Sequence, residues 1–310
     1  MPLVDSKAML IYAMEHEFAV GAFNANNMEI AQAIVEAAEE EKAPVIVQIS
    51  QGAIEYAGEN CLFAIVKVLA DKAKVPVVCH LDHGVDFHTV IRALRAGFTS
   101  LMFDGSSLPF EENVKITKNL VEIAHAAGVP LEAEIGKVPD AAKGPLSPEE
   151  IKKYLTTPEE ALEFFERTGV DSLAVSVGSA HRMKVQSAEL DIERIAQIRE
   201  KVKAPLVLHG ASGVKDDSVV KAIRAGIAKI NFATELNKAF TLALRQKLSS
   251  ELELVDVRKY GNVARENVKN IVRKKIQLLG SSKKAQDIIN YFSANNYVGK
   301  EGSDKAQIIE

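Results

Sequence analysis

Short apolar runs rich in Val, Ile and Leu alternate along the chain with longer stretches whose apolar residues recur every three or four positions. The short runs are typical of buried parallel strands, and the longer stretches are typical of amphipathic helices. Eight strands are predicted, at Phe18–Asn24, Val45–Ser50, Val75–His83, Ser100–Asp104, Leu131–Gly136, Ser172–Gly178, Leu206–Gly210 and Lys229–Ala233. The helices predicted around them include Asn27–Glu41, Asp86–Ala96, Phe110–Ala127, Asp191–Val202, Asp216–Ala225 and Glu235–Leu248, with Asp191 and Asp216 as N-caps. Repeated βα units of this kind predict an α/β protein.

Eight βα units either close into a (β/α)₈ TIM barrel or lie open as a doubly wound sheet. An open dinucleotide-binding sheet usually carries GxGxxG after its first strand, and the turn after residues 18–24 lacks it. We therefore predict a TIM barrel in a single domain, 1–310, with extra C-terminal helices within 262–294. A polar tail at 295–310 is expected to be poorly ordered. The longest irregular connection, 141–157, follows the fifth strand and is predicted to be a mobile lid.

The overall charge restricts the classes of partner. With a formal net charge of −4 and a pI near 6.0, the 310-residue chain has no general attraction for nucleic acid or anionic membranes, and we expect neither as a partner. Affinity for phosphate must come from a local site. Only Cys61 and Cys79 are present, without CxxC spacing, and no run approaches the roughly 18 apolar residues of a membrane span. We expect a cytoplasmic protein without disulfides.

Polar residues follow all eight predicted strands, where a TIM barrel places its chemistry. They are Asn24, Ser50, Asp82, His83, Asp104, Glu134, His181, His209, Ser212 and Asn231. Each one alone is equally well explained as a residue that caps a turn. Their occurrence after every strand favours a functional site at this end of the barrel.

Three histidines, His83, His181 and His209, follow strands three, six and seven. A closed barrel brings these positions together, and three imidazoles with an open fourth position are typical of catalytic zinc. Hydrogen-bonded structural roles are the alternative for each histidine, but the three together favour a metal. His80 lies two residues before Asp82 and therefore on the same face of the strand, and it is predicted to orient residues of the site without contacting the metal itself.

Carboxylates accompany the predicted metal ligands. Asp82 precedes His83 and is predicted to shuttle a proton, the alternative being a turn cap before Gly84. Asp104, Glu132 and Glu134 either hold a second cation or pair with lysines inside the barrel. Glu132 and Glu134 share one strand face because side chains alternate with a period of two.

The segments HGASG (209–213) and KINFATE (229–235) end strands seven and eight, where barrels often bind phosphate. Small residues there let backbone N–H groups approach an anion. Gly210, Ser212, Asn231 and Thr234 are the candidate phosphate ligands.

The motifs VCHLDHG, LEAEIG, VGSAH, LVLHGASG and INFATE occur in this order over nearly the whole chain. Together they resemble the class II fructose-bisphosphate and tagatose-bisphosphate aldolases. The resemblance implies reversible cleavage of fructose 1,6-bisphosphate to dihydroxyacetone phosphate and glyceraldehyde 3-phosphate, a reaction of glycolysis and gluconeogenesis. In this reaction a bound zinc ion stabilises the enediolate.

The resemblance also implies roles for individual residues. Zinc would be bound by His83, His181 and His209, with Asp82 as the proton donor and acceptor. Asp104 and Glu134 would lie near the metal, and substrate contacts would include Asn24 and Ser50. One phosphate would be held by Gly178, Gly210, Ser212, Asn231 and Thr234. The stretch DVRKY matches a segment whose arginine, here Arg258, reaches a neighbouring subunit's site, which implies a homodimer or homotetramer.

Two positions depart from the family pattern. Arg182 follows the second zinc histidine, where the family usually has Gly, and its guanidinium would replace a bound monovalent cation such as Na⁺ or K⁺ at the phosphate. The loop after strand five reads VPDAAKG where a glutamate is usual, so Asp140 or Glu149 would substitute.

Aldolases without a metal use a Schiff-base lysine. Lys229 is predicted at the wrong end of strand eight, and Lys137 and Lys184 lie just past strand ends in loops, so no lysine is an obvious interior nucleophile. The alternatives are a tagatose 1,6-bisphosphate aldolase, which the ATEL segment resembles, a metal hydrolase and an inactive barrel with a binding role. The hydrolase usually carries an HxH pair on strand one, which FAVGAFN lacks.

Overall fold

The computed structural model describes residues 3–140, 148–183 and 186–295. The strands are β1 Val20–Asn24, β2 Val45–Ser50, β3 Val77–Asp82, β4 Leu101–Phe103, β5 Leu131–Ile135, β6 Ser172–Val175, β7 Leu206–Leu208 and β8 Ile227–Phe232. The helices are α1 Lys7–Glu15, α2 Met28–Glu41, α3 Gln51–Ala57, α4 Glu59–Lys72, α5 Phe87–Ala96, α6 Phe110–Ala126, α7 Pro148–Lys152, α8 Pro158–Thr168, α9 Ile192–Lys201, η2 Ala211–Gly213, α10 Asp216–Arg224, α11 Thr234–Ser250, α12 Val257–Leu278 and α13 Ala285–Ala294. All eight predicted strands are present.

The eight strands form one parallel sheet in the order β3-β2-β1-β8-β7-β6-β5-β4. Its two edge strands meet through parallel bridges that pair His80 with Ser100 and Gly84 with Phe103. The Leu81 amide donates to the Ser100 carbonyl at 3.0 Å across this seam. The sheet is thus closed into a barrel, and the predicted (β/α)₈ fold is confirmed.

Local signals in the sequence set most of the helix ends. The side chains of Asn27, Asp86 and Asp191 accept hydrogen bonds from backbone N–H groups in the first turns of α2, α5 and α9, as N-caps do. The N-cap predicted at Asp216 is wrong, because Lys215 occupies that position and Asp216 is the first helical residue of α10. Its charge remains favourable there, in the positive end of the helix dipole.

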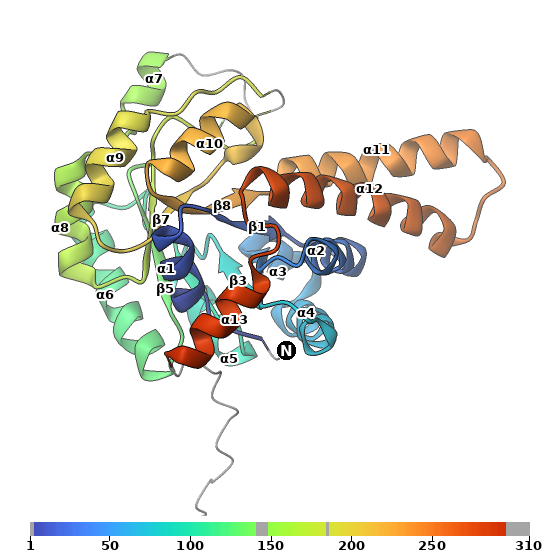
Figure 1. Cartoon of the computed structure of the whole chain (residues 1–310), viewed down its shortest axis with the longest axis horizontal. Helices are drawn as coiled ribbons and strands as arrows, with labels where there is room; N and C mark the ends of the chain where they lie inside the picture. The colour runs from blue at the N-terminus through green and yellow to red at the C-terminus, as the bar shows by residue number, and fades with distance from the viewer. Residues whose placement is uncertain (1–2, 141–147, 184–185, 296–310) are drawn as a thin grey trace, which may run out of the picture.

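Apolar side chains close the N-terminal end of the barrel. Val20, Ile46 and Val78 belong to one buried cluster with Met9 and Leu10 of α1, to which α13 also contributes. Figure 1 shows α1 and α13 beside each other at the barrel. Because this end is sealed, the polar strand ends gather at the opposite, C-terminal end.

The helices α11 and α12 form a long hairpin that extends away from the barrel (Figure 1). At its far end Leu252, Val255 and Val257 are 84%, 88% and 62% exposed. At its base Arg273 pairs with Glu41 of α2 at 3.0 Å. The C-terminal helices predicted within 262–294 are present, with α12 beginning earlier, at Val257.

Some sequence predictions lie partly outside the described residues. The predicted lid, 141–157, contains the short helix α7, and residues 141–147 lie outside the described part. The predicted tail lies outside it except for Asn295. Both cysteines are free, as expected. Among the described residues, every helix is too short or too polar to cross a membrane.

Candidate active site

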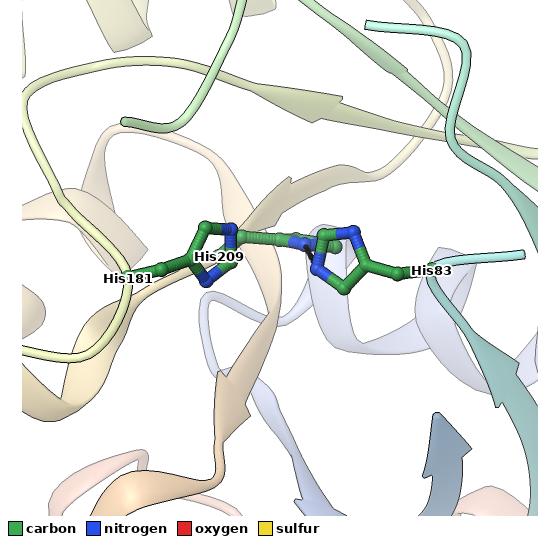
Figure 2. Close-up of side chains that lie close together, drawn as sticks. All are labelled: His83, His181 and His209. Atoms are coloured by element: carbon green, nitrogen blue, oxygen red, sulfur yellow. Dashed lines mark hydrogen bonds between the residues drawn. The ribbon is translucent and has the colours of Figure 1, made fainter. Parts of the chain in front are cut away.

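His83, His181 and His209 converge at the C-terminal end of the barrel from the ends of three different strands (Figure 2). One ring nitrogen from each lies within 4.8 Å of the others. Nε2 of His83 is 2.9 Å from Nδ1 of His209, and the ring centroids of His83 and His181 are 5.0 Å apart. The predicted convergence of these histidines is therefore present in the fold.

The orientation of His83 is fixed from behind by a carboxylate. Its Nδ1 lies 2.6 Å from Asp104 Oδ2, which leaves Nε2 facing the other histidines. Burial lowers the pKa of His83, but the negative charge of Asp82 and the hydrogen bond to Asp104 outweigh it and raise the pKa to about 10. For His181, burial and the charge of His83 lower the pKa to about 3. In the cluster without a metal, His83 therefore carries the positive charge, and His181 stays neutral.

Glu134 provides a direct indication that the cluster suits a cation. Its Oε2 is buried and has no hydrogen-bond partner, yet it lies 3.5 Å from His209 Nδ1. Burial and the neighbouring charge of Asp104 raise its pKa to about 8. His83, Asp104 and Glu134 also form a second group of ligand atoms within 4.8 Å of one another. A divalent cation among these atoms would satisfy the orphaned oxygen, so the donor set fits a metal of the zinc type.

Asp82 ends β3 beside the histidines and is 5% exposed. It accepts hydrogen bonds from Asn24 Nδ2 at 2.7 Å and from Asn231 Nδ2 at 3.2 Å. Burial raises the pKa of this carboxyl, but the charges of His83 and His209 and the bond from Asn24 lower it below its usual value. Asp82 is therefore an ionised carboxylate held in one orientation, as a proton acceptor requires.

His83, His181 and Asp82 border a pocket that opens at this end of the barrel, whereas His209 is buried behind it. Its lining consists of Asn24, Gln48, Asp82, His83, His181, Arg182, Gly210, Ser212, Asn231, Ala233 and Thr234. Four predicted phosphate ligands are therefore brought together here. Gln48 was not among the predicted residues, although the period of two places it on the same face of β2 as Ser50. Its Nε2 donates to Asn24 Oδ1 at 2.6 Å, and its buried Oε1 has no partner.

Known proteins match this chain along nearly its whole length. A family model for class-II fructose-bisphosphate aldolase matches residues 4–284. The chain belongs to this aldolase family. It is 44% identical over 302 residues to the fructose-bisphosphate aldolase of Thermus caldophilus, covering 90% of this chain and 98% of that protein. It is 43% identical to a probable fructose-bisphosphate aldolase of Bacillus subtilis (strain 168), with coverage of 92% and 100%. The crystal structure of the YdjI aldolase from Escherichia coli K12 matches with a TM-score of 0.80 and 36% identity, over 91% of this chain and 99% of that one.

Three residues to which the aldolase family pattern gives substrate contacts lie outside the pocket lining. Ser50 caps α3, where its Oγ accepts from the Ala53 amide at 3.2 Å. Gly178 has φ 111°, and a Cβ there would lie 2.9 Å from the Glu189 carbonyl oxygen, so the backbone alone requires glycine. Arg258 begins α12 at the far end of the hairpin, where its side chain is 87% exposed and pairs with Asp256. Arg258 is therefore not part of the lining of this chain's own pocket.

Arg182, where this chain departs from the aldolase pattern, lines the pocket in a left-handed backbone conformation, with φ 58°. Its Nε donates to Asp140 Oδ1 at 2.8 Å. Asp140 is thus occupied by an ion pair at the pocket rim. Glu149, the other candidate for the aldolase loop glutamate, lies in α7, and its side chain is outside the described part.

The prediction that Lys229 begins strand eight is wrong. β8 begins at Ile227, so Lys229 lies inside the strand, and its side chain is fully buried. Its Nζ lies 2.8 Å from Glu132 Oε2. Glu132 therefore pairs with a barrel lysine, which was one of its two predicted roles. Burial raises the pKa of Glu132, but the charge of Lys229 and the bond to His209 lower it well below its usual range.

Proposed function

We propose that this chain reversibly cleaves fructose 1,6-bisphosphate to dihydroxyacetone phosphate and glyceraldehyde 3-phosphate at a zinc site formed by His83, His181 and His209. The observation that carries the proposal is the convergence of three imidazole nitrogens beside the ionised Asp82. Membership of the class-II aldolase family supports the reaction type. The unpartnered Glu134 oxygen supports the cation.

The residues around the cluster have distinct roles in this proposal. Zinc bound there supplies Lewis-acid polarisation of the substrate carbonyl. In the cleavage direction Asp82 accepts the proton of the hydroxyl next to the breaking bond, and in synthesis it returns that proton. Asn24 and Asn231 hold the carboxylate in place through their hydrogen bonds. Asp104 orients His83, and Glu134 offers its free oxygen to a cation.

Phosphate binding is assigned to the rim of the pocket. Gly210, Ser212 and Thr234 line it beside the N-termini of η2 and α11, where backbone N–H groups suit an anion. At Gly210 φ is 67°, and a Cβ would lie 2.8 Å from the Ala180 backbone, so the close packing of this turn on the loop that carries His181 requires glycine. Arg182 supplies the charge that a monovalent cation, Na⁺ or K⁺, would otherwise provide.

An oligomer follows if Arg258 takes part in catalysis. Arg258 lies at the end of a projecting hairpin whose neighbouring Leu252 and Val255 are strongly exposed. From there it can reach only a pocket of another copy. We therefore propose a homodimer or homotetramer in which Arg258 contacts the far phosphate of a neighbouring subunit's substrate. The cytoplasmic location remains a prediction.

The test combines metal removal with a search for a covalent intermediate. Stripping with a chelator should abolish release of triose phosphate, and added Zn²⁺ or Co²⁺ should restore it. Full cleavage in excess chelator, together with trapping of substrate by borohydride, would instead assign the reaction to a Schiff-base lysine. Bound zinc without any cleavage would leave the inactive barrel as the better description.

A second substrate is favoured by one feature of the pocket. Ala233 lines it and begins the ATEL segment that resembles tagatose-bisphosphate aldolases. The two ketose bisphosphates differ in configuration at C4, one of the two carbons of the breaking bond. Comparing kcat/KM on both substrates decides between them, and a higher value with tagatose 1,6-bisphosphate would replace the fructose assignment.

A further inference from the structure

A pair of opposite charges lies inside the barrel directly behind the histidine cluster. Lys229 Nζ donates to Glu132 Oε2 at 2.8 Å, and both side chains are 1% exposed. The other carboxylate oxygen, Glu132 Oε1, lies 2.9 Å from Nε2 of His209. On the opposite edge of the same imidazole, Nδ1 lies 2.9 Å from Nε2 of His83. Glu132 therefore contacts the edge of His209 that points away from the cluster.

This contact decides which nitrogen of His209 carries the proton. An ionised carboxylate accepts hydrogen bonds and donates none, so the 2.9 Å contact requires a proton on Nε2. Asn231 Nδ2 lies farther from Nε2, at 3.3 Å, and donates to Asp82 Oδ1 instead. The lone pair is then on Nδ1, the nitrogen that faces His83. A metal-binding histidine needs this arrangement, with one nitrogen free for the metal and the other held by an acceptor.

The positive charge of Lys229 offsets the free-energy cost of burying the Glu132 carboxylate. A buried carboxylate without a counter-charge costs several kcal/mol, and removing one partner of a buried pair is strongly destabilising. Lys229 also occupies Oε2, which leaves Oε1 for His209. Behind Lys229 the contacts continue to His80 Nε2 at 3.2 Å, and His80 Nδ1 lies 2.8 Å from Ser100 Oγ. The pair is thus anchored to the seam between β3 and β4.

We propose that Glu132 and Lys229 are positioning residues that fix the tautomer and ring orientation of His209 for metal binding through Nδ1. The inference rests on the proposed metal site. It adds that the affinity of this site for zinc depends on a hydrogen-bond acceptor at position 132, whereas the charge of Lys229 only compensates the charge of Glu132.

Two double variants separate these effects because neither leaves an unpaired buried charge. Glu132→Gln with Lys229→Met keeps an oxygen that accepts from His209 Nε2, whereas Glu132→Leu with Lys229→Met removes it. Asp171→Asn is a control for loss of a buried carboxylate elsewhere. Its carboxylate accepts from the Leu131 amide at 2.8 Å and lies 2.7 Å from His125 Nε2, and it is not part of the site.

The measurements are zinc affinity, by competition with a chromophoric chelator, and the visible spectrum of the cobalt-loaded protein. We expect the Leu/Met protein to bind zinc roughly 10–100-fold more weakly than the Gln/Met protein, with an altered cobalt spectrum. The Gln/Met protein and Asp171→Asn should stay close to the parent in both. Equal zinc affinities in the two double variants would overturn the proposal, since the pair would then be only structural.

A measurement on the parent keeps the proposal testable if the double variants do not fold. In the zinc-loaded protein labelled with ¹⁵N-histidine, long-range ¹H–¹⁵N spectra report which ring nitrogen of each histidine is protonated. We expect His209 protonated at Nε2, and a proton on Nδ1 would overturn the inference. A parent that binds no zinc at His209 at all would instead contradict the proposed function.

Discussion

Replacing Asp82 by Asn removes one negative charge from the pocket and little else. The side chain keeps its size, and its amide oxygen can still accept from Asn24 Nδ2, now 2.7 Å from Asp82 Oδ2. The amide nitrogen then faces Asn231 Nδ2, so the longer bond, 3.2 Å in the parent, is lost. Losing one hydrogen bond costs about 1 kcal/mol of stability. Losing a positioned base lowers kcat by roughly 10²–10⁴, which is ~2.7–5.4 kcal/mol of transition-state stabilisation.

These two magnitudes make the catalytic and structural roles separable in one set of assays. Initial rates of triose phosphate release should fall by the factor above, whereas zinc content should stay at the parent value. Asp82 Oδ1 is 3.9 Å from His83 Nε2, and Asp82 is in neither group of potential metal ligands. The matched control is Asp86→Asn, which alters the N-cap of α5 four residues away and should leave kcat unchanged.

The role of Asp82 would be refuted by either of two results. Loss of zinc together with activity would mean that the carboxylate holds the metal site together. A kcat within tenfold of the parent, with full zinc, would mean that another group moves the proton.

Three further predictions address the periphery of the site and the fold. Arg182→Gly should raise KM by the equivalent of a charge-assisted hydrogen bond, ~1.5–3 kcal/mol, and make activity depend on Na⁺ or K⁺; an unchanged KM would mean that the arginine serves only Asp140. Arg258→Ala should raise KM without changing zinc content, and a parent that is active as a monomer in sedimentation would contradict its role across subunits. Glu41 accepts from Arg273, Gln277 and Ser282. Burial raises the pKa of Glu41, but these hydrogen bonds lower it by more, so the pKa in the folded protein is below the usual value. The contribution of the Glu41 carboxylate to stability is therefore fully present above the unfolded pKa of about 4.3, and it is lost as the pH falls through the pKa of the folded protein. The stability gap between parent and Glu41→Gln in urea titrations should therefore be about 2 kcal/mol at pH 7 and narrow below pH 4.

The barrel was predictable because each strand is marked in the sequence by its own short apolar run. The run Leu206–Leu208 is apolar on both faces, as strands covered by helices on one side and a packed interior on the other must be. The start of β8 was misplaced at Lys229, since a lysine normally ends an apolar run. Its counter-charge, Glu132, is 97 residues away in the sequence. Only the closed barrel shows that the lysine is compensated there.

The convergence of the histidines was predictable, because all parallel strands of a barrel end on one face. Their orientation was not, since it depends on partners from other strands. Asp104 after β4 fixes His83 after β3, and Glu132 on β5 fixes His209 after β7. Gln48 was missed for the opposite reason. A single amide inside an apolar strand gives no motif, although its position two residues before Ser50 placed it on the interior face.

The spacing of polar residues on three strands explains why the site has a supporting layer at all. His80 and Asp82 on β3, Glu132 and Glu134 on β5, and Lys229 and Asn231 on β8 are each two residues apart, so each strand directs two polar side chains into the barrel. The second members Asp82 and Asn231 line the pocket, Glu134 lies beside His83 and His209, and the first member of each pair lies one layer deeper. The deeper residues satisfy one another, with Lys229 between His80 and Glu132. A buried layer of charged side chains is less stable than apolar side chains that fill the same space, so we expect such a layer to have a function. Among the described residues this layer contacts the histidine cluster through Glu132 and His209, and for this reason we assign the function of the layer to that histidine.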